Sequence, residues 1–199
     1  MDTYGVRRLI PAVIVVIIII FAVIALVSAG RSLFSRSASG REELNIARQE
    51  LTNTAEGSKV IMHVRGPIVA TEEFVGYIIE ITPKNRAITL YSGYEQKTIK
   101  TITLKNSQKA YDQFVHALVE AGLLKTRTLS EDENSTVGVC ADDSVYEFKV
   151  YNQNEQKQYI WTTDCRSEDG SLKSQVRPIE NLFKKQIPNY EDILKQIDL

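Results

Sequence analysis

The hydrophobic and polar positions divide the chain into a long apolar segment and a polar domain. Residues 9–30 carry no charged side chain and consist mainly of isoleucine, valine and alanine. A helix rises about 1.5 Å per residue, so this segment reaches roughly 33 Å and can cross a hydrocarbon core of about 30 Å. Since backbone groups in lipid must be hydrogen-bonded within the segment, the pattern predicts a single transmembrane helix, with the lipid bilayer as its partner.

The apolar segment has two interpretations, a retained signal anchor or a cleaved signal peptide. A short basic tail over residues 1–8 precedes it, and Val27-Ser28-Ala29 has the small residues of a cleavage site. The apolar run before Ser28 is about 18 residues long, which exceeds the roughly 7–15 residues of a signal-peptide hydrophobic region. We therefore expect a retained anchor, and a protein secreted after cleavage near Ala29 is the alternative.

A linker and a folded domain follow the apolar segment. The linker starts with a serine-rich stretch, after which Leu44, Ala47 and Leu51 recur at helical spacing. Residues 31–58 are therefore predicted to contain a short surface helix, and a stalk helix continuous with the membrane helix is the alternative. The domain proper is expected over residues 59–199.

The first half of the domain has the residue pattern of β-strands. Short runs rich in β-branched and aromatic residues are separated by polar turns, which is typical of an antiparallel sheet. The predicted strands cover Val60–Val64, Ile68–Ala70, Phe74–Ile81, Ala87–Tyr91 and Gln96–Leu104.

The apolar period then changes to that of a helix. Apolar residues recur at helical spacing after a cap at Asn106 or Ser107, and Gly122 is a typical stop. A second amphipathic helix is predicted near the C-terminus, where Pro188 interrupts the pattern and Asn189 caps a short tail helix. We expect an α+β fold in which one or two amphipathic helices cover an antiparallel β-sheet. The apolar positions are Ala110, Tyr111, Phe114, Val115 and Leu118 in the first helix and Ile179, Leu182, Phe183 and Ile187 in the second.

Two cysteines flank a predicted β-hairpin. Strand-forming residues on both sides of the polar turn Asn152–Glu155 predict antiparallel strands over Val145–Tyr151 and Lys157–Thr163. The numbers of facing residues in such a hairpin add to about 307, and those of Cys140 and Cys165 add to 305, so the two side chains are expected to face each other. We predict a disulfide that closes the hairpin, and a pair of free buried thiols is the alternative.

The predicted disulfide decides the expected orientation. Basic residues lie on both sides of the apolar segment, so their distribution alone does not orient it. Disulfides persist in oxidising compartments. We therefore expect a single-pass protein of the cell membrane, with a cytoplasmic N-terminus and an extracytoplasmic domain over residues 59–199.

Composition and motifs exclude several functions. The chain is 43% hydrophobic and 25% charged, with 24 basic and 25 acidic residues. This balance excludes the basic footprint of a nucleic-acid-binding protein and a strongly acidic disordered tail. The sequence has no nucleophile-elbow, metalloprotease or nucleotide-binding motif, so we expect no cofactor, no resident metal and no catalytic activity.

The two histidines do not form a recognisable catalytic motif. His116 is expected on the surface of the first helix, off its apolar stripe. His63 alternates with Ile61 in the first strand and therefore takes the opposite face of the sheet. It is a candidate general base without a visible partner.

Acidic residues on either side of Cys140 are candidate cation ligands. A hard cation such as Ca²⁺ takes about six to eight oxygen ligands, but the spacing here matches no EF-hand loop. A solvated acidic loop is therefore the preferred interpretation. The same loop contains the N-glycosylation acceptor sequence Asn134-Ser135-Thr136. The acidic residues are Glu131, Asp132, Glu133, Asp142 and Asp143.

Aromatic residues around the hairpin are the candidate binding face. Tyrosine and tryptophan are enriched at contact hot spots. Tyr151, Tyr159 and Trp161 lie on the two hairpin strands and are expected to be exposed together.

These features predict a membrane-anchored extracytoplasmic module of the cell envelope. Its expected role is binding or structural, and its expected partner is a protein or an envelope polymer. One alternative is an envelope enzyme with a site assembled from carboxylates such as Glu72, Glu73, Asp142 and Asp143.

A second alternative comes from the layout of the chain. A hydrophobic N-terminal helix, an amphipathic continuation, a sheet and a late disulfide together resemble a type IV pilin-like subunit of a secretion apparatus. Precursors in that family carry a glycine followed by Phe-Thr-Leu-x-Glu at the start of the apolar run. Here Gly5 is followed by Val6-Arg7-Arg8, and residues 9–30 contain no glutamate.

Overall fold

The computed structural model of the chain describes residues 42–165 and 170–197. The predicted basic tail, transmembrane segment and cleavage site lie outside these residues. In the described part, no helix combines the length and apolar character needed to cross a bilayer. The chain divides into two units, Met1–Asn45 and Ile46–Leu199, and the second unit, which contains the sheet, is described below.

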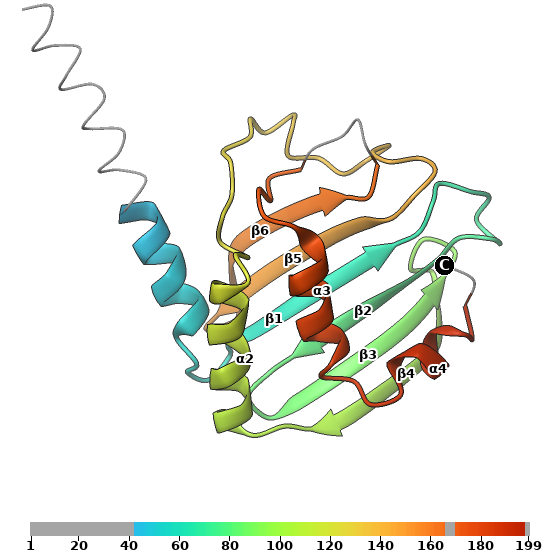
Figure 1. The fold of residues 1–199 in the computed structure, drawn as a ribbon. Coiled ribbons are helices and arrows are strands. Elements are labelled where there is room, and N and C mark those ends of the chain that lie inside the picture. Colours follow the sequence, from blue (N-terminus) through green and yellow to red (C-terminus); the bar gives the residue numbers. More distant parts are fainter. Residues whose placement is uncertain (1–41, 166–169, 198–199) are drawn as a thin grey trace, which may run out of the picture. The chain divides into compact units, whose positions relative to one another are not determined.

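An antiparallel sheet of six strands forms one layer of the domain. Its strands are β1 (Lys59–Arg65), β2 (Val75–Ile81), β3 (Asn85–Ser92), β4 (Lys97–Lys105), β5 (Val145–Asn152) and β6 (Glu155–Thr163). They lie in the order β4-β3-β2-β1-β5-β6, so β1 pairs with β2 on one side and with the distant β5 on the other (Figure 1). The predicted antiparallel sheet with helices is thus confirmed.

Helices form the second layer. They are α2 (Gln108–Glu120), α3 (Val176–Lys184) and α4 (Tyr190–Leu194). α2 begins after Ser107, whose hydroxyl accepts a hydrogen bond from the Ala110 N–H, as expected of a cap. Gly122 follows the helix with φ of 90°, a conformation that favours glycine. The predicted apolar stripe is buried at Tyr111, Phe114, Val115 and Leu118.

The core lies between the helices and one face of the sheet. The rings of Phe114 on α2 and Phe183 on α3 meet edge to face, with centroids 5.1 Å apart. Phe183 also contacts Phe148 on β5, with centroids 5.9 Å apart. A further helix over residues 42–52 precedes β1, and its Leu51 is buried in the same core. The end of the predicted linker therefore packs with the domain.

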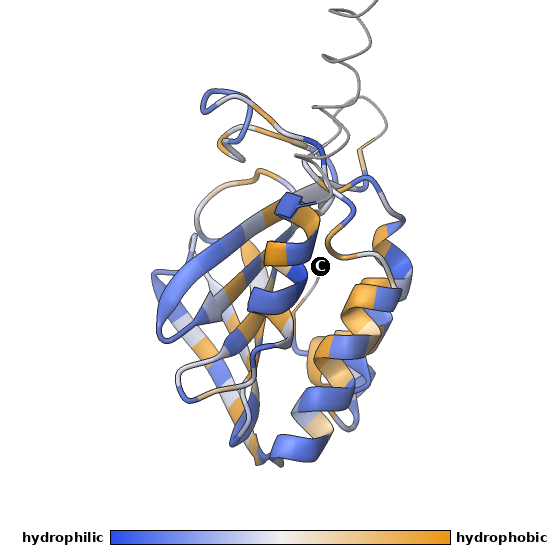
Figure 2. Cartoon of the chain, turned by 90° about the vertical axis from the view of Figure 1, so that its left-hand side faces the viewer, coloured by the Kyte–Doolittle hydropathy of each residue, from blue (hydrophilic) through white to orange (hydrophobic). Residues whose placement is uncertain are grey.

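The opposite side of the sheet, which we call the helix-free face, carries charged, aromatic and aliphatic side chains together. On β1, Val60 and Met62 point into the core, so Ile61 and His63 point away from it because side chains alternate along a strand. Figure 2 shows α2 and α3 together on one side of the sheet. Along the strands the helix-free face includes Lys59, Ile61, His63, Arg65, Gly76, Ile78, Glu80, Tyr91, Glu147, Lys149, Tyr151, Tyr159 and Trp161.

The predicted strand over Ile68–Ala70 is wrong. These residues belong to the loop between β1 and β2. Pro67 has no N–H to donate to a neighbouring strand, and the Ile68 N–H donates to the Ala141 carbonyl of another loop. The β-branched run is therefore held by contacts between loops.

The β5–β6 hairpin confirms the predicted turn. Gln153 and Asn154 have positive φ values of 51° and 66°, as two-residue hairpin turns often require. Tyr151 pairs with Gln156 beside the turn, which is the predicted register. A bulge after these pairs shifts the rest of the hairpin by one residue.

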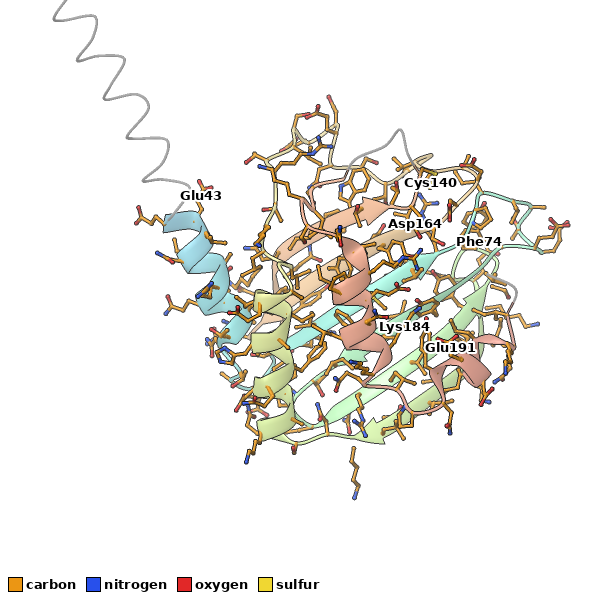
Figure 3. All side chains as sticks on the ribbon, viewed as in Figure 1. Glu43, Phe74, Cys140, Asp164, Lys184 and Glu191 are labelled. Atoms are coloured by element: carbon orange, nitrogen blue, oxygen red, sulfur yellow. A yellow bond between two sulfur atoms is a disulfide. The ribbon has the colours of Figure 1, made fainter. Side chains whose placement is uncertain are left out.

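The predicted disulfide is confirmed. Cys140 and Cys165 are bonded at the open end of the hairpin, and their Cα atoms are 5.6 Å apart. The bond joins Cys140 (labelled in Figure 3), which lies in the long loop before β5, to Cys165, two residues after the end of β6.

Candidate functional site

Two of the three predicted aromatic residues present partly exposed rings on the helix-free face. Tyr151 lies on β5 and Tyr159 on β6, and both are half-buried. The Lys59 ammonium is 4.9 Å from the centroid of the Tyr151 ring, and the Lys149 ammonium is 5.8 Å from that of Tyr159. Each tyrosine therefore combines an aromatic face with a neighbouring positive charge.

Trp161 does not share this exposure. It is 4% exposed, and its indole N–H donates to Oδ1 of Asn134 at 3.0 Å. Asn134 belongs to the loop before β5, which therefore reaches this end of β6. The Asn134 side chain of the predicted glycosylation sequence is engaged in this contact. Trp161 anchors the loop, and the exposed aromatic face is reduced to Tyr151 and Tyr159.

The same loop is fixed to the sheet by an arginine and a threonine. The Arg65 guanidinium on β1 donates to the carbonyl oxygens of Thr136 at 2.7 Å and Val139 at 2.8 Å. The Thr136 hydroxyl donates to the Glu147 carboxylate on β5 at 2.7 Å. These contacts hold the loop in one position beside the helix-free face.

His63 lies between two carboxylates. Its Nδ1 is 3.4 Å from Glu147, which faces it across the β1–β5 pair, and its Nε2 is 3.4 Å from Glu95. The Tyr91 hydroxyl also contacts Nε2. A carboxylate that accepts a hydrogen bond from Nδ1 orients the imidazole. Nε2 is then left to bond to Tyr91, Glu95 or a ligand. The histidine that lacked a partner in the sequence therefore has three in the structure.

The electrostatics of this cluster favour an ionised Glu147. Burial alone raises the pKa of its carboxyl group. Hydrogen bonds from His63 and Thr136, together with the charges of His63 and Lys149, outweigh burial and lower the pKa to about 2. Burial, with the nearby charges of Glu95 and Glu147, raises the pKa of Tyr91, so its hydroxyl stays protonated.

The turn between β3 and β4 brings Glu95 to the histidine. Gly93, Tyr94 and Glu95 have φ values of 64°, 53° and 69°, a left-handed conformation that costs energy at the two residues other than glycine. The Tyr94 ring stacks on Phe74 with centroids 3.7 Å apart, which helps to hold the turn. The carboxylate of Glu95 is thereby directed toward His63.

Gly76 makes room for the Tyr91 side chain. A Cβ at this position would contact the Tyr91 hydroxyl and would lie 2.8 Å from the Val64 carbonyl oxygen. Gly76→Ala is expected to displace Tyr91 from His63 and to lower the free energy of unfolding by about 1–2 kcal/mol. Urea denaturation measures this loss. Tyr91→Phe, which removes only the hydroxyl, is expected to lower the free energy of unfolding by a smaller amount. Equal stability of Gly76→Ala and the wild type would contradict the packing.

The predicted cation-binding carboxylates do not gather into one site in the part of the chain that the structure describes. Glu131, Asp132 and Glu133 are exposed. The Ser130 N–H and hydroxyl donate to Glu133 at 2.9 and 2.8 Å, and these bonds lower the pKa of its carboxyl group. The carboxylate of Asp143 accepts from the Ser144 N–H at 2.8 Å. Glu133 and Asp143 therefore stabilise local turns.

One group of metal-binding residue types does come together among the described residues. The Sγ atoms of Cys140 and Cys165 and a carboxylate oxygen of Asp142 lie within 4.8 Å of one another. The two sulfurs are bonded to each other, so neither is a thiolate that can bind a metal. With the disulfide formed, the Asp142 carboxylate is the one member of this group that can bind a metal.

The remaining sequence candidates lie apart from the histidine cluster. His116 is exposed on α2, in the helix layer. Glu72 and Glu73 are exposed in the loop before β2. Among the sequence candidates, His63 is thus the one that joins a cluster of titratable side chains, through its contact with Glu147. Their pairing depends on two strands distant in sequence, and no local pattern reveals it.

The comparisons with known proteins add no relative. No protein-family model, curated protein or solved structure matches the chain.

Proposed function

We propose that the chain is a membrane-anchored binding module whose α+β domain lies on the extracytoplasmic side. The helix-free face of the sheet is its binding surface, and a protein or an envelope polymer is its partner. The role is non-catalytic. The observation that carries this proposal is the half-exposed pair Tyr151 and Tyr159, each beside a lysine.

The location rests on two features of the chain. The uncharged segment over residues 9–30 is long enough to cross a bilayer as a helix. The bond between Cys140 and Cys165 is of a kind that persists in oxidising compartments and is rare in the cytosol. Together they favour an anchor with the domain outside the cytoplasm.

The binding role rests on the organisation of the helix-free face. Tyrosines with an adjacent ammonium group provide contact area with little loss of conformational entropy on binding. The neighbouring loop is already fixed by Arg65, Thr136 and Trp161, so a partner would meet a preformed surface. This arrangement supports recognition more directly than it supports chemistry.

The proposal predicts that Tyr159 contributes to binding. Tyr159→Ala in the full-length chain is expected to reduce co-sedimentation with the insoluble envelope polymers of its host, or retention of its protein partner, by at least about tenfold, since a hot-spot tyrosine contributes about 1.4 kcal/mol or more. His116→Ala, on the opposite layer, is the matched control and should bind like the wild type. Equal binding by Tyr159→Ala and the wild type would remove the helix-free face as the binding surface.

A second candidate function is an acid–base enzyme. Glu147 beside Nδ1 would orient His63 as a general base, and Nε2, which contacts the Tyr91 hydroxyl, would take up the proton. The His63 side chain is only 11% exposed, which favours the binding role. A hydrolytic or isomerising activity that is present in the wild type and lost in His63→Gln, with the fold retained, would favour the enzyme instead.

A further inference from the structure

A groove lined mainly by polar residue types lies at the end of the sheet where β1 begins. Its volume is about 870 Å³, which is in the range of small-molecule binding sites. Four segments line it: residues 55–59 at the start of β1, Glu80 with residues 82–85 around the β2–β3 turn, residues 106–108 at the start of α2, and Asn154 in the hairpin turn. The groove is separate from the cluster around His63.

The walls of the groove are tied together by hydrogen bonds. The Asn154 N–H donates to the Gly57 carbonyl oxygen at 3.1 Å, which joins the hairpin turn to the segment before β1. The Asn106 amide donates to the Thr82 carbonyl oxygen at 2.7 Å, which joins the start of α2 to the β2–β3 turn. The protein's own hydrogen bonds therefore hold the walls of the groove, and a ligand would need to reorganise them little.

The charges of the groove balance. Its lining contains two lysines and two glutamates, and each lysine lies beside a glutamate. Lys59 is 3.1 Å from Glu80, and Lys84 is 3.4 Å from Glu56. A lining without net charge gives no field that would select an anion or a cation.

The other lining groups are amides and hydroxyls. Asn85, Gln108 and Asn154 are exposed carboxamides at the groove, and its lining residues without a polar side chain are Ala55, Gly57 and Pro83. Carboxamides offer both donors and acceptors, as hydroxyl-rich ligands require. The Gln108 amide nitrogen donates to the Thr54 carbonyl oxygen and to the Asp112 carboxylate, so Gln108 offers a ligand its Oε1 as an acceptor. Carbon atoms of these side chains also line the groove, so its surface mixes polar and apolar patches.

An aromatic ring borders the groove on the helix-free face. Lys59 lines the groove and pairs across the sheet with Tyr151, and its ammonium lies over the Tyr151 ring. A ligand that extends from the groove past Lys59 reaches the aromatic surface described above. The groove and the binding face are therefore continuous at this lysine.

From the groove, its balanced charges and the adjoining Tyr151, we infer that it binds a neutral oligosaccharide. The sugar hydroxyls bond to the carboxamides of Asn85 and Gln108 and to the two lysine–glutamate pairs. The apolar face of a further sugar ring stacks on Tyr151. This inference rests on the proposed binding function and names its ligand class, a hydroxyl-rich uncharged polymer.

The test uses the full-length chain in lipid nanodiscs and saturation-transfer difference NMR. The probes are three neutral trisaccharides, cellotriose, maltotriose and triacetylchitotriose, and inorganic phosphate serves as competitor. We expect at least one trisaccharide to bind without competition from phosphate. Asn85→Ala and Gln108→Ala should each weaken the binding of that trisaccharide about fivefold, which is the effect of one lost hydrogen bond of about 1 kcal/mol. Gln113→Ala, an exposed amide on the same helix outside the groove, is the matched control.

Three results would overturn the inference. The first is no binding of any of the three trisaccharides, and the second is binding that Asn85→Ala and Gln108→Ala leave unchanged. The third is displacement by phosphate, which would make the groove an anion site. Because Tyr159 lies outside the groove, the co-sedimentation test of Tyr159→Ala fails or succeeds independently and separates this inference from the proposed function.

Discussion

Glu147→Gln is expected to lower the free energy of unfolding by about 3 kcal/mol, since breaking a buried ion pair typically costs about 3–5 kcal/mol. Glu147 is 8% exposed, and its carboxylate has several polar partners. The Thr136 hydroxyl donates to it at 2.7 Å, and His63 and Lys149 lie 3.4 and 3.6 Å from it. Glutamine keeps the shape but removes the negative charge that faces His63 and Lys149.

The matched control for this variant is Glu155→Gln. Glu155 lies 2.6 Å from Lys157 on the same strand, β6, but it is exposed, with 74% of its side chain accessible. An exposed pair of this kind contributes about 0–1 kcal/mol. Urea denaturation of both variants gives the comparison. A loss at Glu147 no larger than that at Glu155 would mean that the buried cluster does not stabilise the fold.

The same carboxyl group predicts a pH dependence. Its pKa is lowered to about 2 in the folded protein, below its ordinary value of 4.5. A lowered pKa stabilises the fold fully above about pH 4.5, and this contribution disappears as the pH falls toward 2. The stability difference between the wild type and Glu147→Gln should therefore be largest above pH 5 and shrink steadily between pH 4.5 and 2. A constant difference over that range would contradict the assignment.

Loss of the disulfide is the other large expected effect. Cys140 and Cys165 are 25 residues apart, and closing a loop of that length stabilises a fold by about 3 kcal/mol in the chain-entropy model. The double variant Cys140→Ser/Cys165→Ser is expected to lose this amount in urea denaturation. Its serines keep the side-chain size nearly unchanged, so the loss reports the cross-link.

The control for the disulfide is the wild type unfolded in the presence of a reductant. Reduced wild type and the double serine variant should have the same stability, because both lack the bond. Arg65 holds the preceding loop through two carbonyl oxygens in either case. A stability loss below about 1 kcal/mol would show that these contacts, and not the bond, fix the end of the hairpin.

Elements set by neighbouring residues could be predicted from the sequence. Ser107 and Gly122 bound α2 as expected, and the polar turn around Gln153 and Asn154 predicted the register of the pairs beside it and, within one residue, that of the rest of the hairpin. These features depend on backbone preferences within a few residues. The disulfide followed from them, because the hairpin register brings its two ends together.

The candidate site could not be predicted in the same way. His63 meets Glu147 only because β1 pairs with β5, and the two residues are 84 positions apart in the chain. Glu95 reaches the histidine through a turn with two strained residues, for which the sequence has no strong signal. Trp161 has the strand position expected of an exposed residue, but a bond to Asn134 buries it under a loop.

The central proposal, a retained anchor with the domain outside the cytoplasm, is tested most directly by mass spectrometry. The protein is isolated from the membrane fraction of its host, alkylated without reduction, and its intact mass is measured. The proposal predicts the full-length mass with neither Cys140 nor Cys165 alkylated. A full-length mass with both cysteines alkylated would contradict it by placing the domain in a reducing compartment, and a mass that begins near Gly30 would contradict the retained anchor.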